Sequence, residues 1–331
     1  MTSTADATTG EAASSGAPLK VLVPTSIDLA LAPRDDVRYV SYDPAEPIAA
    51  EHEDADALIV WGTPDALLKD AARRLTRVRW VQVLSAGTDA LVAAGFDSEV
   101  ILTSGRSLHD RPVAEHALAL VLAAARRLHT LVRAQIGHRW ASDIGGVQRE
   151  PSPGLFSTLR DAHVLIWGFG SIGASLAPHL TALGAEVTGV ATSAREQDGV
   201  RVIATEDLAD ELPRTDVLIM ILPATEGTAK ILDADRLAQL PPHAWVVNVG
   251  RGSTVDEDAL LDALRARRLA GAALDVTSLE PLPADSPLWD EANLILTPHA
   301  AGGRPLGASA LIDENVAALL GDRPMRNLVQ G

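Results

Sequence analysis

Short apolar runs and amphipathic segments alternate along the chain after Pro18, a pattern that is typical of parallel α/β domains. In the first third, runs rich in Val, Ile and Leu predict strands at 20–24, 37–42, 57–61, 78–84 and 100–103, with a helix at about 64–75. A second series predicts strands at 162–167, 186–191, 216–222, 245–249, 272–276 and 294–297. Because these runs are almost continuously apolar, we expect strands that are buried on both faces of a parallel sheet.

A long helix is predicted at 110–133, because Asp110 suits a helix cap, Pro112 the first turn and Glu115 the positive end of the helix dipole. Its residues 117–125 are apolar around most of the circumference, so the helix needs cover from another domain or another subunit. We therefore expect a homodimer that forms through residues 112–133. Further helices are predicted at 171–183 and 256–269, and the segment 144–157 is expected to be a loop.

Composition narrows the possible functions. A length of 331 residues favours two domains, and the net charge of −16 disfavours nucleic acid as a partner. The chain has no cysteine, which excludes disulfides, thiolate nucleophiles and Cys-ligated metal centres. Residues 1–17 are rich in Ser, Thr, Ala and Gly and are expected to be a disordered tail without the features of a secretion signal. The longest apolar stretch is far below the about 20 residues that span a bilayer, so we expect a cytoplasmic protein.

A glycine motif follows the strand predicted at 162–167. Gly168, Gly170 and Gly173 have the GxGxxG spacing, and they stand between a predicted strand and a predicted helix. In that setting the first glycine allows a tight turn, the second lets the backbone approach a pyrophosphate, and the third lets the helix pack closely on the strand. The motif therefore predicts a dinucleotide-binding loop, although a plain glycine turn would need the same residue type.

The residues after the next strand bear on the choice of cofactor. NAD-binding chains place an acidic residue there to bind the ribose 2′-hydroxyl, but this chain has Ala191, Thr192, Ser193 and Arg195 and no carboxylate before Glu196. Because hydroxyls and a guanidinium suit a 2′-phosphate, the sequence predicts that NADP(H) is favoured and that NAD(H) is possible. The alternative is that Arg195 is a solvated cation, neutralised by neighbouring acids.

Three polar residues follow three of the predicted strands, where open α/β sheets bind their ligands. Arg251 can grip a carboxylate, Glu280 can fix the tautomer of a histidine, and His299 can give a proton to a carbonyl oxygen that receives a hydride. Each residue alone also has a structural explanation, as a surface cation, a loop acid or a core histidine. The other eight histidines lack zinc-binding spacings, so no metal site is predicted.

These motifs resemble the D-isomer-specific 2-hydroxyacid dehydrogenase family, and the resemblance runs from about Leu19 to Leu328. The relevant segments are LSAGTD at 84–89, RPVAEHA at 111–117, NVGRGSTVDEDAL at 248–260, ALDV at 273–276 with Glu280, and TPHAAG at 297–302. The resemblance implies two Rossmann/flavodoxin-like parallel-sheet domains with a deep cleft between them. The implied substrate-binding domain is 18–106 plus 301–331, with a returning helix at 307–320, and the NAD(P)-binding domain is 107–300.

The family's site residues map onto this sequence as expectations. Arg251, Glu280 and His299 would be catalytic, and the amides of Ser85, Ala86 and Gly87 would hold the substrate carboxylate together with Arg251. The cofactor site would comprise Gly168, Phe169, Gly170, Ser171, Ile172, Gly173, Thr192, Ser193, Arg195, Leu222, Pro223, Thr228, Val249, Asp275 and His299. Within that set, Asp275 would meet the nicotinamide carboxamide.

The resemblance implies a 2-oxoacid reductase that forms D-2-hydroxyacids, similar to the NADPH-using glyoxylate and hydroxypyruvate reductases, which also lack the aspartate that Ala191 replaces here. Glu280 disfavours formate dehydrogenase, which has glutamine at that position. The rival enzyme is a D-3-phosphoglycerate dehydrogenase, for which Arg106, Arg111 and Arg304 are candidate phosphate ligands. A rival of another class is a non-catalytic protein that senses the cofactor.

Overall fold

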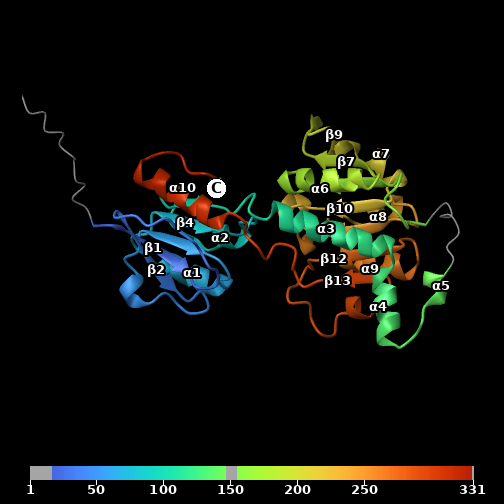
Figure 1. Cartoon of the computed structure of the whole chain (residues 1–331), viewed down its shortest axis with the longest axis horizontal. Coiled ribbons are helices and arrows are strands. Elements are labelled where there is room, and N and C mark those ends of the chain that lie inside the picture. The colour runs from blue at the N-terminus through green and yellow to red at the C-terminus, as the bar shows by residue number, and fades with distance from the viewer. Residues whose placement is uncertain (1–16, 147–154, 330–331) are drawn as a thin grey trace, which may run out of the picture. The chain divides into compact units, whose positions relative to one another are not determined.

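The computed structural model describes residues 17–146 and 155–329, which form two units with one sheet each (Figure 1). Within this range, unit 1 comprises residues 17–84, 90–104 and 308–329, and unit 2 comprises residues 85–89, 105–146 and 155–307. The chain thus leaves unit 1, builds unit 2 and returns to unit 1 for its last helix. The expected tail 1–17, apart from Ala17, lies outside the described residues, as does 147–154 of the expected loop.

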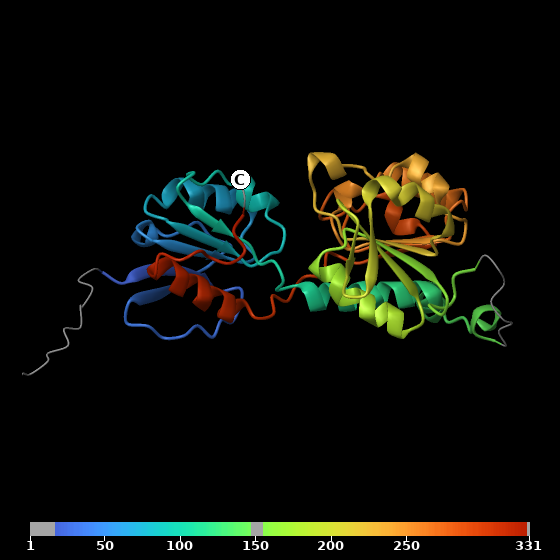
Figure 2. The ribbon, with the colours of Figure 1, turned by 90° about the horizontal axis from the view of Figure 1, so that it is seen from above.

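Unit 1 is a parallel sheet of five strands in the order β2-β1-β3-β4-β5. Its strands are β1 (Leu19–Pro24), β2 (Val37–Tyr42), β3 (Ala57–Val60), β4 (Trp80–Val83) and β5 (Ile101–Thr103). Its helices are α1 (Asp65–Arg74), α2 (Asp89–Ala93) and α10 (Ala308–Leu320). In Figure 2, α1 and α2 lie on one face of the sheet and α10 on the other, so both faces are covered.

A buried polar network holds the returning helix α10 on this sheet. Gln82 and Asn315 are both fully buried, and the Asn315 side-chain amide donates to Gln82 Oε1 at 2.8 Å. Asn315 Oδ1 also accepts from the backbone N–H of Arg326 at 2.8 Å, and Trp80 Nε1 donates to Thr103 Oγ1 at 2.8 Å. Because an unmade hydrogen bond in this core would leave a buried polar group unsatisfied, the network specifies how the C-terminal segment docks.

Unit 2 is a sheet of eight strands in the order β13-β12-β11-β10-β6-β7-β9-β8. Its strands are β6 (His163–Trp167), β7 (Glu186–Ala191), β8 (Arg195–Gln197), β9 (Val200–Ala204), β10 (Val217–Met220), β11 (Trp245–Asn248), β12 (Gly271–Leu274) and β13 (Leu294–Leu296). The strands from β9 to β12 have the order of a doubly wound dinucleotide-binding sheet, whose switch point lies between β6 and β10. Only β8 is antiparallel to its neighbour, β9, and neither of these two strands is among the sequence predictions.

Helices cover both faces of this sheet (Figure 2). The helices of unit 2 are α3 (Asp110–Ala125), α4 (Leu128–Ile136), α5 (Ser142–Gly145), α6 (Ser171–Ala182), α7 (Leu208–Glu211), α8 (Ala234–Gln239) and α9 (Glu257–Arg265). Alternate residues of each central strand face opposite layers: Val164 and Ile166 pack with α3 and α6, whereas Leu165 and Trp167 pack with the α7–α9 layer. The predicted burial of these strands on both faces is confirmed.

The prediction of one helix over 110–133 is wrong, because α3 ends at Ala125 and α4 begins at Leu128. Arg127 between them has a left-handed backbone, with φ of 54°. No Gly or Pro marks this break, and the apolar pattern runs through it. The capping prediction is also wrong: Asp110 lies inside the first turn, and its carboxylate accepts from Ser171 Oγ at 2.9 Å.

Within the part of the chain that the structure describes, each helix is too short or too polar to span a lipid bilayer.

His129, near the start of α4, makes the stability of unit 2 sensitive to acid. Its ring packs edge-on against Trp245, and its buried Nδ1 has no hydrogen-bond partner among the described residues. Burial, with Arg133 and Arg127 nearby, lowers the pKa of His129 to about 4. Between that pKa and the ordinary value of about 6.5, the unfolded chain binds more protons than the folded chain, so acidification favours unfolding.

We therefore expect the free energy of unfolding to fall between about pH 6.5 and pH 4, by about 1 to 2 kcal/mol from this half-buried ring. The His129→Phe variant keeps an aromatic ring against Trp245 but cannot titrate. Urea unfolding of both proteins at a series of pH values should show a shallower loss for the variant. Parallel curves for the two proteins over this range would contradict the assignment.

Candidate active site

The glycine loop lies at the switch point of the unit 2 sheet, between the end of β6 and the start of α6. Gly168 has φ of 96°, and a Cβ there would lie 2.6 Å from the Ile221 carbonyl oxygen, so the turn requires glycine. A Cβ on Gly173 would press against the ring of Phe169, whereas Gly170 has open space around it. The loop therefore leaves open space beside Gly170, at the N-terminus of the 12-residue helix α6, which is a setting that suits a phosphate group.

Phe169 and Arg195 shape the edge of this loop. The Phe169 ring is buried beneath β7, where a Cβ on Gly189 would collide with it, and the Phe169 N–H donates to the Val190 carbonyl oxygen at 2.9 Å. The Arg195 guanidinium donates to the Phe169 carbonyl oxygen at 2.8 Å and to Gln197 Oε1 at 2.9 Å. Among the described residues, Arg195 pairs with neither of the neighbouring acids, and Thr192, Ser193 and Arg195 are all exposed.

The segment after β10 forms the facing wall of the switch point. Thr228 Oγ1 donates to the Pro223 carbonyl oxygen at 2.6 Å and accepts from the Thr225 N–H at 2.8 Å, which closes the loop 223–228. A Cβ on Gly250 would lie 2.7 Å from the backbone of Leu222, so the segments that follow β10 and β11 pack directly together. Val249, at the end of β11, is buried.

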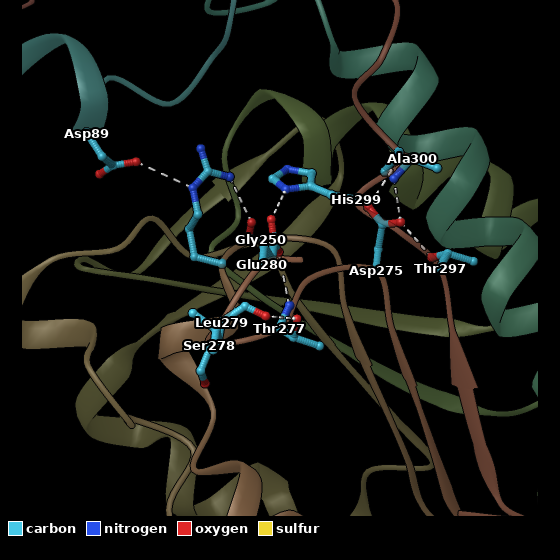
Figure 3. Close-up of polar contacts among 12 residues, drawn as sticks. Asp89, Gly250, Asp275, Thr277, Ser278, Leu279, Glu280, Thr297, His299 and Ala300 are labelled. Atoms are coloured by element: carbon cyan, nitrogen blue, oxygen red, sulfur yellow. Dashed lines mark hydrogen bonds and ion pairs between the residues drawn. The ribbon is translucent and has the colours of Figure 1, made fainter. Parts of the chain in front are cut away.

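Arg251 follows β11 and is fixed through its backbone. The fully buried Asn248 donates to the Arg251 carbonyl oxygen at 3.0 Å, and Thr254 Oγ1 donates to the same oxygen at 2.6 Å. The guanidinium donates to the Gly250 carbonyl oxygen at 2.8 Å, and its Nε lies 3.4 Å from Asp89 Oδ2 (Figure 3). With 31% of its side chain exposed, Arg251 remains accessible to a ligand.

The loop 85–89, which belongs to unit 2, lies against this guanidinium. A Cβ on Gly87 would overlap the Arg251 guanidinium, so only glycine allows the close approach. Ser85 Oγ donates to the Gly87 carbonyl oxygen at 2.8 Å. No described residue accepts a hydrogen bond from the backbone N–H groups of Ser85, Ala86 or Gly87. These free donors, together with Arg251, can hold a carboxylate.

Glu280 and His299 form a pair, with His299 Nδ1 at 2.7 Å from Glu280 Oε2 (Figure 3). The side chains are 46% exposed for His299 and 37% for Glu280, so the imidazole remains accessible to a ligand. A carboxylate at Nδ1 favours the tautomer that carries its proton there and stabilises the doubly protonated ring. The pair can therefore deliver a proton through Nε2, to which no described residue is hydrogen-bonded.

The loop that carries Glu280 is held from two sides. Glu280 Oε1 accepts from the Thr277 N–H at 3.0 Å, and Glu257 Oε1 in the first turn of α9 accepts from the Ser278 N–H at 2.6 Å. A Cβ on Gly252 would overlap the Thr277 carbonyl group, so the Arg251 segment and the Glu280 loop pack backbone to backbone. The structure thus brings the three residues singled out from the sequence to neighbouring loops of one unit.

Asp275, at the end of β12, is surrounded by protein donors. Its side chain is 0% exposed, and its carboxylate accepts from Thr297 Oγ1 at 2.5 Å and from the backbone N–H groups of Ala300 at 2.9 Å and Ala301 at 3.0 Å. Because protein donors surround the Asp275 carboxylate, the structure favours a structural role for it over the contact with the nicotinamide carboxamide that the resemblance implies.

A cavity of about 610 Å³ opens beside the His299–Glu280 pair. Most of its wall is apolar, and its lining residues are Asp275, Thr277, Glu280, Pro281, Leu282, Trp289, Leu296, Thr297, Pro298 and His299. The described residues include no group of three His, Asp or Glu side chains that is arranged to hold a metal ion.

Several residues that position this site are not among the sequence predictions. Asn248, Glu257 and Thr297 lie within quoted motifs, and the signal that marks Asn248 is a polar residue at the end of an otherwise apolar strand. His116 lies within the quoted segment RPVAEHA without a predicted role in the site, and its Nε2 lies 3.2 Å from Asp275 Oδ1. The three candidate phosphate ligands are all exposed in unit 2: Arg106, Arg111 and Arg304.

Comparison with known proteins agrees with this geometry. Residues 118–301 match the model of the D-isomer specific 2-hydroxyacid dehydrogenase, NAD binding domain. Glyoxylate/hydroxypyruvate reductase A of Klebsiella pneumoniae (strain 342) is 32% identical over 85% of this chain and 88% of its own length. D-3-phosphoglycerate dehydrogenase of Mycobacterium tuberculosis (strain H37Rv) is 33% identical over 87% of this chain but over only 52% of its own length.

Among solved structures, a D-isomer specific 2-hydroxyacid dehydrogenase from Xanthobacter autotrophicus Py2, in complex with NADPH and MES, has a TM-score of 0.75 and 31% identity. The alignment covers 95% of this chain and 98% of that one. The matched model covers more than half of the chain, and the reductase relative matches it over most of its length. This protein belongs to the D-isomer specific 2-hydroxyacid dehydrogenase family of NAD(P)-dependent oxidoreductases.

Proposed function

We propose that the protein is an NADPH-dependent 2-oxoacid reductase of the glyoxylate and hydroxypyruvate type, which forms D-2-hydroxyacids. The observation that carries the proposal is the 2.7 Å contact between His299 Nδ1 and Glu280 Oε2 beside the Arg251 loop. A titratable donor and a carboxylate-binding cation are the two groups that the reduction of a 2-oxoacid requires from a protein. A protein that only sensed the cofactor would not need this pair.

The substrate carboxylate is held by Arg251 and by the free N–H groups of 85–87. Arg251 lies against Gly87, so the guanidinium and the loop amides converge on one anion. Binding the carboxylate in this way brings the adjacent carbonyl group near His299, and the remaining guanidinium donors polarise that carbonyl.

His299 supplies the proton that the carbonyl oxygen needs during reduction. Nε2 donates it, and the Glu280 carboxylate at Nδ1 stabilises the charged ring before the transfer and orients the neutral ring afterwards. NADPH, when bound, supplies a hydride to the C2 carbon. In the reverse direction His299 accepts the proton of the 2-hydroxyl group.

The residues of the glycine loop fit this cofactor. Gly170 leaves open space at the N-terminus of α6 for the pyrophosphate, and the closed loop 223–228 faces it across the switch point. Exposed hydroxyls of Thr192 and Ser193 and the guanidinium of Arg195 suit the 2′-phosphate of NADPH, and no carboxylate stands where NAD-binding chains place one.

The Arg195→Gln variant should lose most of the preference for NADPH. A charge-assisted hydrogen bond contributes about 1.5 to 3 kcal/mol, so we expect KM for NADPH to rise by about 10- to 100-fold. Glutamine keeps a donor for the Phe169 carbonyl oxygen, and KM for NADH should therefore change little. A parallel rise for both cofactors would indicate that Arg195 only supports the glycine loop.

The test of the proposed function is a panel of 2-oxoacids assayed with NADPH and NADH in parallel. We expect turnover of glyoxylate and hydroxypyruvate, with NADPH preferred. Pyruvate and longer apolar 2-oxoacids belong in the panel because the cavity beside His299 has apolar walls. Preference for 3-phosphohydroxypyruvate would favour the phosphoglycerate dehydrogenase alternative, and NADPH binding without turnover of any 2-oxoacid would favour a sensing role.

We further propose a homodimer that forms through α4 rather than through α3. The apolar face of α3 is largely covered by α6 and the sheet within unit 2. In contrast, α4 and the residues after it expose a stripe of large apolar side chains: Leu128 at 47%, Val132 at 49%, Ile136 at 74% and Trp140 at 92%. The first three recur every fourth residue, so they share one helix face, which favours burial against a second copy.

Replacing Val132 and Ile136 with Glu should therefore yield a monomer of unchanged fold. Light scattering would give the mass, and circular dichroism would check the fold. The matched control is Leu279→Glu, which adds one charge at another exposed apolar position in unit 2 and should leave a dimer intact. A wild-type chain that is monomeric at micromolar concentration would contradict the proposal.

A further inference from the structure

One buried residue, Asp275, accepts the hydrogen bonds that hold the segment that carries His299. The Asp275 backbone oxygen accepts from the His299 N–H at 2.7 Å, and the Asp275 carboxylate accepts from the Ala300 and Ala301 N–H groups (Figure 3). His299 has φ of 51°, in the left-handed region that a non-glycine residue adopts only when its surroundings hold it there. Asp275 thus fixes the backbone conformation from which the His299 ring projects.

His116 completes the shell of donors around this carboxylate. It lies in the second turn of α3, and its Nε2 is 3.2 Å from Asp275 Oδ1 and 3.1 Å from Thr297 Oγ1. The Thr297 hydroxyl donates its own hydrogen to Asp275 Oδ1 at 2.5 Å, so it can only accept from His116. His116 Nε2 therefore carries a hydrogen and donates it into the Asp275–Thr297 pair.

We propose that His116 is a positioning residue for the reaction: it donates through Nε2 to Asp275 and Thr297 and thereby holds the segment 297–301 so that His299 meets the substrate. The inference rests on the proposed role of His299. No hydrogen bond or ion pair of the described residues joins His116 to His299 or Glu280, so His116 acts through Asp275 and Thr297. Without this donor, the buried carboxylate loses a partner at the oxygen that also holds the Ala300 N–H.

Three substitutions at His116 separate the hydrogen bond from the bulk of the side chain. His116→Gln places an amide nitrogen near the position of Nε2 and keeps the donor. His116→Asn places its amide nearer the position of Nδ1, too far back to reach the pair, and His116→Leu has no donor. The control is His163→Leu, which removes another histidine paired with a carboxylate, at 3.0 Å from Glu186, on the far end of β6 from the glycine loop.

The readouts are kcat and KM for the 2-oxoacid, the deuterium isotope effect on kcat with NADPH deuterated at C4, and hydrogen exchange at the Ala300 and Ala301 amides. For His116→Leu and His116→Asn we expect kcat to fall by about 10- to 100-fold with little change in KM, because a small misplacement of a catalytic group slows the chemical step. The isotope effect should rise, and the two amides should exchange faster. His116→Gln and His163→Leu should behave like the wild type.

Wild-type kcat and wild-type exchange in His116→Asn would overturn the inference, as would an equal loss of kcat in all three His116 variants. If His116→Leu fails to fold, the test rests on the other two variants: kcat should fall in His116→Asn and stay near the wild-type value in His116→Gln. A wild-type protein that reduces no 2-oxoacid refutes the proposed function instead. In that case the exchange of the Ala300 and Ala301 amides still tests whether His116 holds the segment.

Discussion

The His299→Asn variant should reduce 2-oxoacids with a kcat about 100- to 10,000-fold below that of the wild type, because general acid–base catalysis contributes that much. Asparagine tolerates the left-handed backbone that His299 adopts, with φ of 51°, better than most residues do. Its side-chain amide can also donate to Glu280 Oε2 in place of Nδ1. The substitution therefore removes the proton carried at Nε2 and keeps the rest of the loop.

The control for this variant is the affinity for NADPH, measured by quenching of protein fluorescence. We expect the Kd for NADPH to stay close to the wild-type value, because the glycine loop and Arg195 are unchanged. A kcat for His299→Asn near that of the wild type would remove His299 from the chemistry.

The Arg251→Gln variant should lose about 100- to 1,000-fold in kcat/KM for the 2-oxoacid, the loss typical of removing one donor that stabilises developing charge. Arg251 has two proposed roles, to hold the substrate carboxylate and to polarise the carbonyl group. Loss of the first should raise KM for the 2-oxoacid, and loss of the second should lower kcat. Arg251→Lys should recover only part of the loss, because an ammonium cannot bind a carboxylate in the bidentate geometry of a guanidinium.

The matched control is Arg267→Gln, which removes an exposed arginine after α9 and should leave kcat/KM unchanged. A loss in Arg251→Gln that appears only in the affinity for NADPH would place Arg251 in the cofactor site and not in the substrate site.

Much of the fold could be predicted from local pattern. The buried strands are recognisable as apolar runs, because both faces of a parallel sheet are covered. The strand β6, the glycines and α6 follow one another in the order that the dinucleotide motif requires. The edge strand β8 could not be predicted in this way, and its neighbour β9 is also absent from the sequence predictions. Arg195, Glu196 and Gln197 are polar, and only the pairing of β8 with β9 makes them a strand.

The break between α3 and α4 was missed for a different reason. Arg127 adopts a left-handed conformation without being Gly or Asn, so no local signal marks the turn, and tertiary contacts such as the packing of His129 on Trp245 accompany it. Likewise the three candidate catalytic residues could be found one by one after their strands. The role of Asp275 could not, because its donors Thr297, Ala300 and Ala301 are brought to it only by the fold.

The most direct test of the account is to follow the hydrogen itself. The protein is incubated with hydroxypyruvate and NADPH that carries deuterium at both C4 positions, and the product is analysed by mass spectrometry and chiral chromatography. We expect D-glycerate with one deuterium at C2, and no such product from His299→Asn over the same time. Unlabelled product, the L enantiomer, or the absence of glycerate from the wild-type reaction would contradict it.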